Sequence, residues 1–181
     1  MAKILVVDDL AANRELVVEL IVHRGHQPLE AADGAEALAL VRAEHPDLVF
    51  SDILMPTMDG YEFVRQLRAD PALAATEVIF YSAHYRERQA RNLAKACGVS
   101  RVLIKPAEPE DILRAIDEAL AHAPEPPAAL PDASEFDREH LRLMSDKLAE
   151  QVEHLQAANQ RLTALTALNL HLPRSLIRRS C

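Results

Sequence analysis

The sequence predicts an α/β fold in which helices cover both faces of a parallel sheet. Five short strand-like segments, at residues 4–7, 27–31, 48–52, 77–81 and 101–104, are each followed by a helical pattern. Most of these segments are apolar without polar alternation, which is typical of strands buried on both faces. Strict alternation of strands and helices favours a parallel sheet, because each helix carries the chain back to the same edge.

Two amphipathic helices separate the first three strands. Apolar residues at helical spacing mark the first helix, which Gly25 ends: Leu16, Val17, Leu20 and Ile21. Asp33 is the expected cap of the second helix, which Ala37, Leu38 and Val41 mark. Pro46 requires that helix to end before the strand at residues 48–52.

The second half of the region repeats this arrangement. A helix at residues 60–67 precedes the fourth strand, a helix at about residues 84–97 precedes the fifth, and a last helix begins near Pro109. That proline and the acids beside it suit the first turn of a helix. Right-handed crossovers leave few topologies for such a chain, and we expect the doubly wound, flavodoxin-like strand order 2-1-3-4-5.

Composition restricts the function classes. The 181 residues carry a formal net charge of -8, which disfavours direct binding of nucleic acid or of an anionic membrane. The two cysteines, Cys97 and Cys181, have neither metal-ligand spacing nor the number of a disulfide framework. The start of the chain is too short and too acidic for a signal peptide, and no apolar run reaches membrane-spanning length. We therefore expect a cytoplasmic protein.

The C-terminal third has a different pattern. Four prolines make residues 123–134 an extended linker, and residues 135–172 predict one long helix of about 55 Å. Leucines recur in it every seven residues, at Leu141, Leu148, Leu155 and Leu162. Together with Val152 and Asn159 they form one mostly apolar stripe along the helix, which we call the seam. The helix either folds back on its own domain or pairs with a second copy as a parallel coiled coil, and we favour the homodimer. Residues 173–181 match no pattern of secondary structure or function and stay unassigned.

Polar residues end four of the five strands. Asp8 and Asp9 follow the first strand, Asp52 ends the third, Ser82 the fourth and Lys105 the fifth. Each alone is more often a cap, a turn residue or a solvated charge, but the topology brings all of them to one edge of the sheet. Three carboxylates there require a cation, and Mg²⁺ suits such oxygen ligands. A carboxylate beside it can accept a phosphoryl group.

Residues 1 to about 122 thus resemble the receiver domain of two-component response regulators. The motifs are Asp8-Asp9, Asp52 with Met55-Pro56 and Asp59-Gly60 behind it, Ser82-Ala83, and Lys105-Pro106. The resemblance implies that Asp52 takes a phosphoryl group from a sensor histidine kinase or phosphotransfer protein. It also implies Mg²⁺ ligation by Asp9, Asp52 and the Leu54 backbone carbonyl, with Asp8 acting through water. Lys105, Ser82 and Ala83 would contact the phosphoryl group, and the Lys105-Pro106 bond would be cis.

One position departs from the family pattern. The family usually has an aromatic residue three positions before the lysine, and this chain has Val102. The switch is therefore expected at Ser82 and Val102 without the usual aromatic rotation. Tyr85 is an alternative moving group, and Tyr81 is interpreted as core or surface filler.

The output remains open. We expect a phosphoacceptor without a separate catalytic domain, since no phosphate-binding loop or second catalytic constellation is present. The chain is either a receiver with a dimerisation helix or the N-terminal portion of a longer sensor kinase or cyclic-dinucleotide enzyme. An aspartate-based phosphatase is a weaker alternative, because Leu54 stands where a general acid is expected. A receiver-like module that binds partners without being phosphorylated is disfavoured by the intact acids and Lys105.

Overall fold

The computed structural model divides the chain into two compact units, Met1–Asp137 and Arg138–Cys181. It describes residues 1–82, 98–99 and 101–121 of the first unit and residues 145, 152, 156 and 160–161 of the second. The predicted helix at residues 84–97, the linker at 123–134 and the tail at 173–181 lie outside these described residues.

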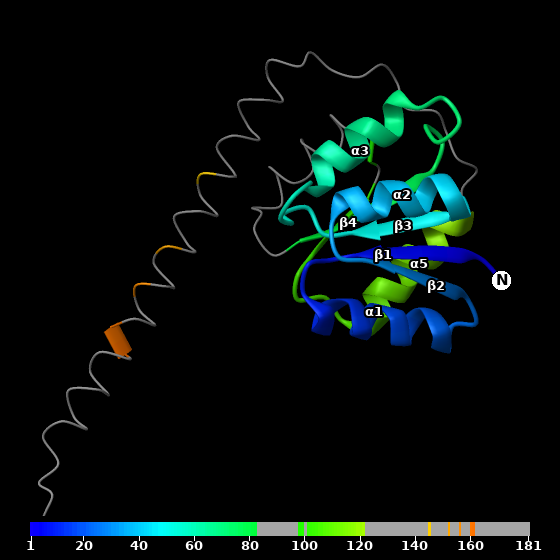
Figure 1. Ribbon diagram of the computed structural model, residues 1–181. Helices are drawn as coiled ribbons and strands as arrows, with labels where there is room; N and C mark the ends of the chain where they lie inside the picture. The colour runs from blue at the N-terminus through cyan, green and yellow to red at the C-terminus, as the bar shows by residue number, and fades with distance from the viewer. Residues whose placement is uncertain are drawn as a thin grey trace, which may run out of the picture. The chain divides into compact units, whose positions relative to one another are not determined.

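The first unit contains a five-stranded parallel sheet in the order β2-β1-β3-β4-β5, which confirms the predicted topology (Figure 1). The strands are β1 (Lys3–Val7), β2 (Gln27–Ala31), β3 (Leu48–Ser51), β4 (Glu77–Ser82) and β5 (Arg101–Ile104). The described helices are α1 (Ala11–His23), α2 (Gly34–Glu44), α3 (Gly60–Ala69) and α5 (Pro109–Ala121). The strand predicted at residues 48–52 ends one residue early, so Asp52 is the first loop residue after β3.

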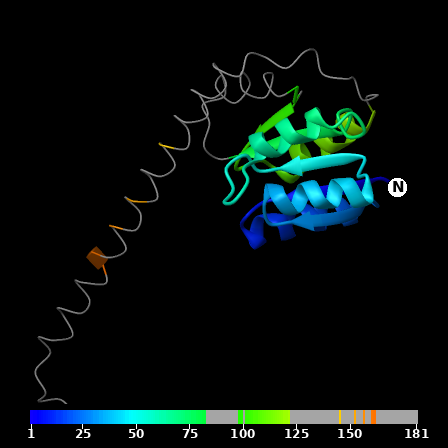
Figure 2. The same ribbon diagram turned by 45° about the horizontal axis from the view of Figure 1, so that its top comes forward.

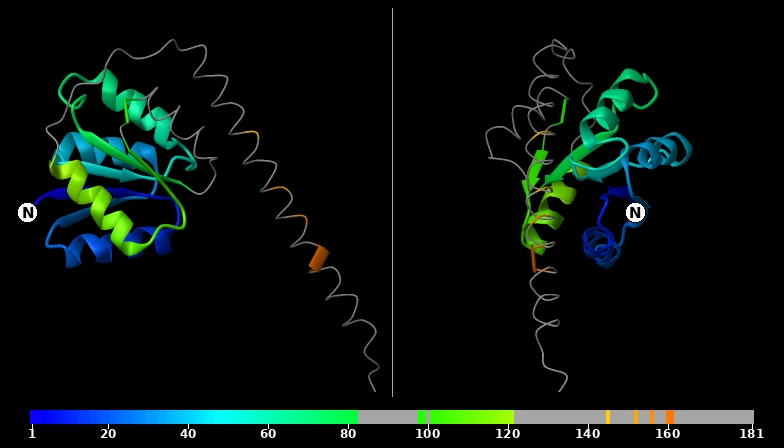
Figure 3. Two further views of the ribbon diagram at one scale, coloured as in Figure 1. Left: turned by 180° about the vertical axis from the view of Figure 1, so that it is seen from behind. Right: turned by 60° about the vertical axis from the view of Figure 1, so that its left-hand side comes forward.

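Helices lie on both faces of the sheet. Helices α2 and α3 are side by side on one face, and α1 and α5 cover the other (Figures 1 and 3). Alternate strand residues point to the α1/α5 face and form a buried cluster with these helices: Ile4, Val6, Leu48, Phe50, Ile79 and Tyr81 from the strands, with Val17, Ile21, Ile112 and Ile116 from the helices. Burial on both faces explains why β1 and β3 are apolar without alternation.

Aspartates begin two of the helices. The Asp33 Oδ1 accepts hydrogen bonds from the backbone N–H groups of Ala35 and Glu36, both at 2.9 Å, which confirms the predicted cap of α2. Asp59 caps α3 in the same way, through Tyr61 at 3.0 Å and Glu62 at 2.9 Å. Such caps satisfy N–H groups that have no partner within the helix.

The amino terminus of the chain lies at the end of the sheet opposite the strand arrowheads (Figures 1 and 2). Functional groups carried by the loops after β1, β3 and β5 therefore lie at the other end. Within the described ranges, none of the helices combines the length and the hydropathy that a membrane span requires.

The described residues of the second unit are helical: Ser145, Val152, Gln156, Gln160 and Arg161. Val152, a residue of the predicted seam, is 50% exposed. The four seam leucines and Asn159 lie outside the described residues, so the coiled coil stays a prediction.

Candidate functional site

The loops at the carboxyl ends of β1, β3 and β5 bring an acid cluster and a lysine together. The Lys105 Nζ donates to Asp8 Oδ2 at 2.6 Å and to Asp52 Oδ2 at 2.8 Å. The side chains of Lys105 and Asp52 are each 13% exposed, and that of Asp8 is 5% exposed. Residues separated by up to 97 positions in the sequence thus share one network of charge-assisted hydrogen bonds.

Burial and charge act in opposite directions on Lys105. Burial alone lowers the pKa of the ammonium, but the charges of Asp52 and Asp8 and their hydrogen bonds together raise the pKa above its usual value. The lysine is therefore fully charged at neutral pH, and it offsets part of the repulsion between the two carboxylates.

Asp8 is held in place by the start of α1. Its Oδ1 accepts from the Leu10 backbone N–H at 2.9 Å and from Asn13 Nδ2 at 3.1 Å. Arg14 Nη1 donates to the Asp8 backbone carbonyl at 2.7 Å. Sequence reasoning missed Asn13 and Arg14, although both lie in the turn of helix directly after the acid pair.

The loop after β3 is fixed by close backbone contacts. The Ile53 N–H donates to Asp52 Oδ1 at 2.5 Å, and the Gly60 N–H donates to the Ile53 carbonyl at 2.7 Å. A Cβ atom at Gly60 would lie 2.4 Å from the Asp52 carbonyl oxygen. Glycine at position 60 is therefore required for α3 to begin this close to Asp52.

The carboxylates of Asp8, Asp9 and Asp52 form a possible metal site. One oxygen of each lies within 4.8 Å of the others. Asp8 is buried and Asp9 is exposed, so the cluster opens to solvent on the Asp9 side. Hard carboxylate oxygens suit Mg²⁺, and the ammonium of Lys105 already bridges two of them, which shows that this cluster binds positive charge.

The remaining predicted site residues are placed differently. Ser82 is fully buried at the end of β4, and its Oγ has no hydrogen-bond partner among the residues that the structure describes. Leu54 is 3% exposed in the loop after Asp52. Val102 is partly buried on β5 opposite Phe80, and Ala83 and Tyr85 lie outside the described residues.

The interpretation of Tyr81 as filler is incomplete. Its ring packs in the α1/α5 core, as filler would, but the Lys105 Nζ lies 5.0 Å from the ring centroid. That distance is within the range of a cation–π interaction. No signal in the sequence placed this ring beside the lysine, because Tyr81 is on β4 and Lys105 is in the loop after β5.

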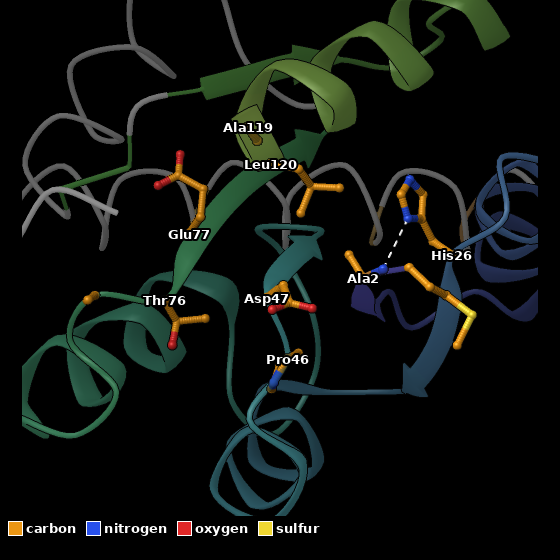
Figure 4. A pocket seen from close by; sticks show the side chains of 10 residues that line it. Ala2, His26, Pro46, Asp47, Thr76, Glu77, Ala119 and Leu120 are labelled. Atoms are coloured by element: carbon orange, nitrogen blue, oxygen red, sulfur yellow. Dashed lines mark hydrogen bonds between the residues drawn. The ribbon is translucent and has the colours of Figure 1, made fainter. Parts of the chain in front are cut away.

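A pocket of about 530 Å³ lies at the opposite end of the sheet (Figure 4). Polar side chains line it from the beginnings of the strands and from the residues just before them, among them His26, Asp47, Thr76 and Glu77. The His26 Nδ1 accepts from the Ala2 N–H at 3.3 Å, and Asp47 Oδ2 accepts from the Lys3 N–H at 2.7 Å. None of the predicted site residues that the structure describes lines this pocket.

Comparisons with known proteins agree with this geometry. A model of the response regulator receiver domain matches residues 4–117. Protein PilH of Pseudomonas aeruginosa is 36% identical over 67% of this chain and 99% of its own length. Response regulator PleD of Caulobacter vibrioides is 35% identical over 59% of this chain, which spans only 23% of that protein.

A solved structure supports the same assignment. The chemotaxis response regulator CheY4 of Vibrio cholerae matches with a TM-score of 0.62 and 33% identity, covering 66% of this chain and 98% of its own. Receiver domains interact with sensor kinases or phosphotransfer proteins. The chain belongs to the response regulator receiver domain family of two-component systems.

Proposed function

We propose that Asp52 accepts a phosphoryl group from a phosphohistidine of a sensor kinase or phosphotransfer protein. The observation that supports this best is the convergence of Asp52, Asp8 and Lys105 within hydrogen-bonding distance at the carboxyl edge of the sheet. A structural ion pair needs one carboxylate for one ammonium, whereas this cluster has three: Asp8 is buried, Asp52 is partly buried and Asp9 is exposed.

The transfer exchanges one bond to phosphorus for another. A carboxylate oxygen of Asp52 attacks phosphorus, and the phosphorus–nitrogen bond to the donor imidazole breaks with its electron pair returning to nitrogen. The products are an acyl phosphate on Asp52 and a free histidine on the donor. The chain assists this reaction on itself and has, in this proposal, no separate catalytic output.

Asp9, Asp52 and the Leu54 backbone carbonyl would hold Mg²⁺, with Asp8 contributing through water. The ion would supply positive charge against the oxygens of the phosphoryl group. Asn13 and the Leu10 N–H keep Asp8 oriented toward the cluster.

Three further residues, Lys105, Ser82 and Ala83, are assigned to the phosphoryl group itself. Lys105 would exchange its contact with Asp52 for a phosphoryl oxygen, which an ammonium can do without a fixed geometry. The buried Ser82 hydroxyl has no partner within the described part of the chain, so it would gain a hydrogen bond when the phosphoryl group arrives. Ala83 would contribute at the same position, and the switch would involve Ser82 and Val102.

Phosphorylation by a small-molecule donor tests the assignment. Incubation with acetyl phosphate and Mg²⁺ should add one phosphate by intact mass spectrometry, and Asp52→Asn should add none. Asp47→Asn is the matched control, because Asp47 is an aspartate that immediately precedes β3 at the other end of the sheet. Equal labelling of Asp52→Asn and the wild type would refute the proposal.

We also propose that the C-terminal helix carries the output by forming a homodimer. The heptad spacing of its leucines and the 50% exposure of Val152 support an unpaired apolar stripe. Leu148→Glu with Leu155→Glu should convert a dimer to a monomer in light scattering, whereas Gln156→Glu should not. A monomeric wild type at high micromolar concentration would end this part of the proposal.

The alternative output is a longer protein of which this chain is the N-terminal portion, such as a sensor kinase or a cyclic-dinucleotide enzyme. The match to PleD, which extends well beyond the receiver, supports it. The phosphatase alternative has less support, since the relatives are response regulators.

A further inference from the structure

We infer that Tyr81 is a positioning residue for Lys105, holding its ammonium over the end of β4 by a cation–π contact. The inference deepens the proposed phosphoryl transfer to Asp52 and rests on it. It assigns a kinetic role to a residue that the sequence alone indicates only as core or surface filler.

The strand order makes the lysine cross β4. Lys105 follows β5, but its ammonium reaches Asp52 after β3 and Asp8 after β1, so the side chain spans the neighbouring strand. The Lys105 backbone N–H donates to the Ser82 carbonyl at 3.1 Å, which fixes the starting point of the side chain at the end of β4. Tyr81 is the adjacent residue on that strand, and the centroid of its ring lies 5.0 Å from the Lys105 Nζ.

The ring is itself held firmly. Tyr81 is 7% exposed, and its ring packs against Phe50 with centroids 5.2 Å apart and planes tilted by 49°. It belongs to the buried cluster that also contains residues of α1 and α5, with Leu103 and Ala107 packed against that cluster. A fixed aromatic face can therefore define the path of the lysine side chain.

The face of the Tyr81 ring suits the Lys105 ammonium, because this ammonium exchanges hydrogen-bond partners in the proposed reaction. The Lys105 ammonium has hydrogen bonds to two carboxylates now and, in the proposed reaction, exchanges one of them for a phosphoryl oxygen. A hydrogen bond would resist that movement, whereas attraction to the face of a ring depends weakly on direction. Tyr81 thus keeps the ammonium near Asp52 while its other partners are exchanged.

Three variants of the full chain test the inference. Tyr81→Leu removes the ring, Tyr81→Phe keeps it, and Ile79→Ala leaves a cavity in the same cluster two residues earlier on β4. We expect Tyr81→Leu to slow phosphorylation by acetyl phosphate about threefold to tenfold, and Tyr81→Phe to match the wild type. Ile79→Ala should lower the melting temperature at least as much as Tyr81→Leu but leave the rate unchanged.

A spectroscopic measurement separates positioning from stability. We expect the ring to shift the NMR signals of the Lys105 ε-methylene protons upfield in the wild type and in Tyr81→Phe, and this shift should disappear in Tyr81→Leu. A wild-type rate in Tyr81→Leu, or an equal loss of rate in Ile79→Ala, would overturn the inference. Failure of the wild type to be phosphorylated at Asp52 would instead refute the proposed function, and the upfield shift would still report the contact.

Discussion

The two ends of the sheet each contain carboxylates, and the difference between them shows what makes a site. At the carboxyl end, Asp8 and Asp52 meet the same ammonium and are mostly buried. At the amino end, Asp47 and Glu77 line an open pocket, and Asp47 accepts a hydrogen bond from a backbone N–H. At the carboxyl end the negative charges surround one ammonium, whereas at the amino end they are spread around the edge of the pocket.

Pocket volume is therefore a poor guide in this fold. The pocket of about 530 Å³ lies at the amino end, away from the acid cluster. Parallel strands concentrate loop residues at their carboxyl ends, where each strand is followed by a turn that is free to carry a functional side chain. At the amino end the same strands begin, and their polar neighbours satisfy backbone groups.

The largest loss of stability is expected when a methyl group is added at Gly60. Gly60→Ala places a Cβ 2.4 Å from the Asp52 carbonyl oxygen, a backbone atom that cannot move without shifting the site. We expect a loss of about 3 kcal/mol in the free energy of unfolding and slower phosphorylation. Urea denaturation measures the first, and acetyl phosphate labelling measures the second.

Gly25→Ala is the matched control at the amino end. Gly25 has a φ of +84° but nothing within 4 Å of a new Cβ, so only the backbone strain of about 1 kcal/mol applies. Phosphorylation should be unaffected. Equal losses of stability in the two alanine variants would show that the Asp52 carbonyl does not exclude a side chain at position 60.

The next effect concerns the charge of Lys105. Its pKa is raised in the folded protein, so its contribution to stability is complete below the usual value of 10.5 and is lost as the pH rises through the folded value. We expect Lys105→Met to cost about 2 kcal/mol at pH 8, because it removes two hydrogen bonds to charged groups. The difference from the wild type should shrink above pH 10.5 in urea titrations. A difference that stays constant to higher pH would contradict the raised pKa.

Much of the fold was predictable because its signals are local. Asp33 was identified as a cap from its place before a helical pattern, and β1 from an unbroken apolar run. The strand order followed from alternation and handedness, and the comparisons and the structure confirm it. The cis Lys105-Pro106 bond, which the family resemblance implied, is also present.

The parts that escaped prediction depend on contacts between distant segments. The ring of Tyr81 meets Lys105 only after β4 and β5 pair, and a strand residue before a serine has no distinguishing local pattern. The sequence likewise gives no sign of the role of Asn13. Its side-chain amide is identified as a hydrogen-bond donor to Asp8 only from the folded position of α1. The end of β3 was placed one residue late because Asp52 continues the backbone hydrogen bonding to Val7 without being part of the strand.

A smaller effect is expected from Mg²⁺. If the acid cluster binds the ion only when folded, Mg²⁺ at ten times its dissociation constant should stabilise the wild type by about 1.4 kcal/mol. Asp9→Asn should abolish the stabilisation, because Asp9 is the exposed member of the cluster. Thermal unfolding with Mg²⁺ and with EDTA measures this, and an unchanged response in Asp9→Asn would remove that residue from the site.

The smallest effect is expected at the amino end. Asp47→Asn keeps an oxygen that can accept from the Lys3 N–H, now at 2.7 Å, and removes only a negative charge from an exposed position. We expect a change below about 0.5 kcal/mol in stability, with no change in Mg²⁺ response or phosphorylation. The same exchange of aspartate for asparagine at position 9 or 52 removes a charge that other charges surround. If Asp47→Asn altered the Mg²⁺ response, the acids at the two ends of the sheet would not act independently. Burial around the Lys105 ammonium would then not explain why only the carboxyl-end acids form a site.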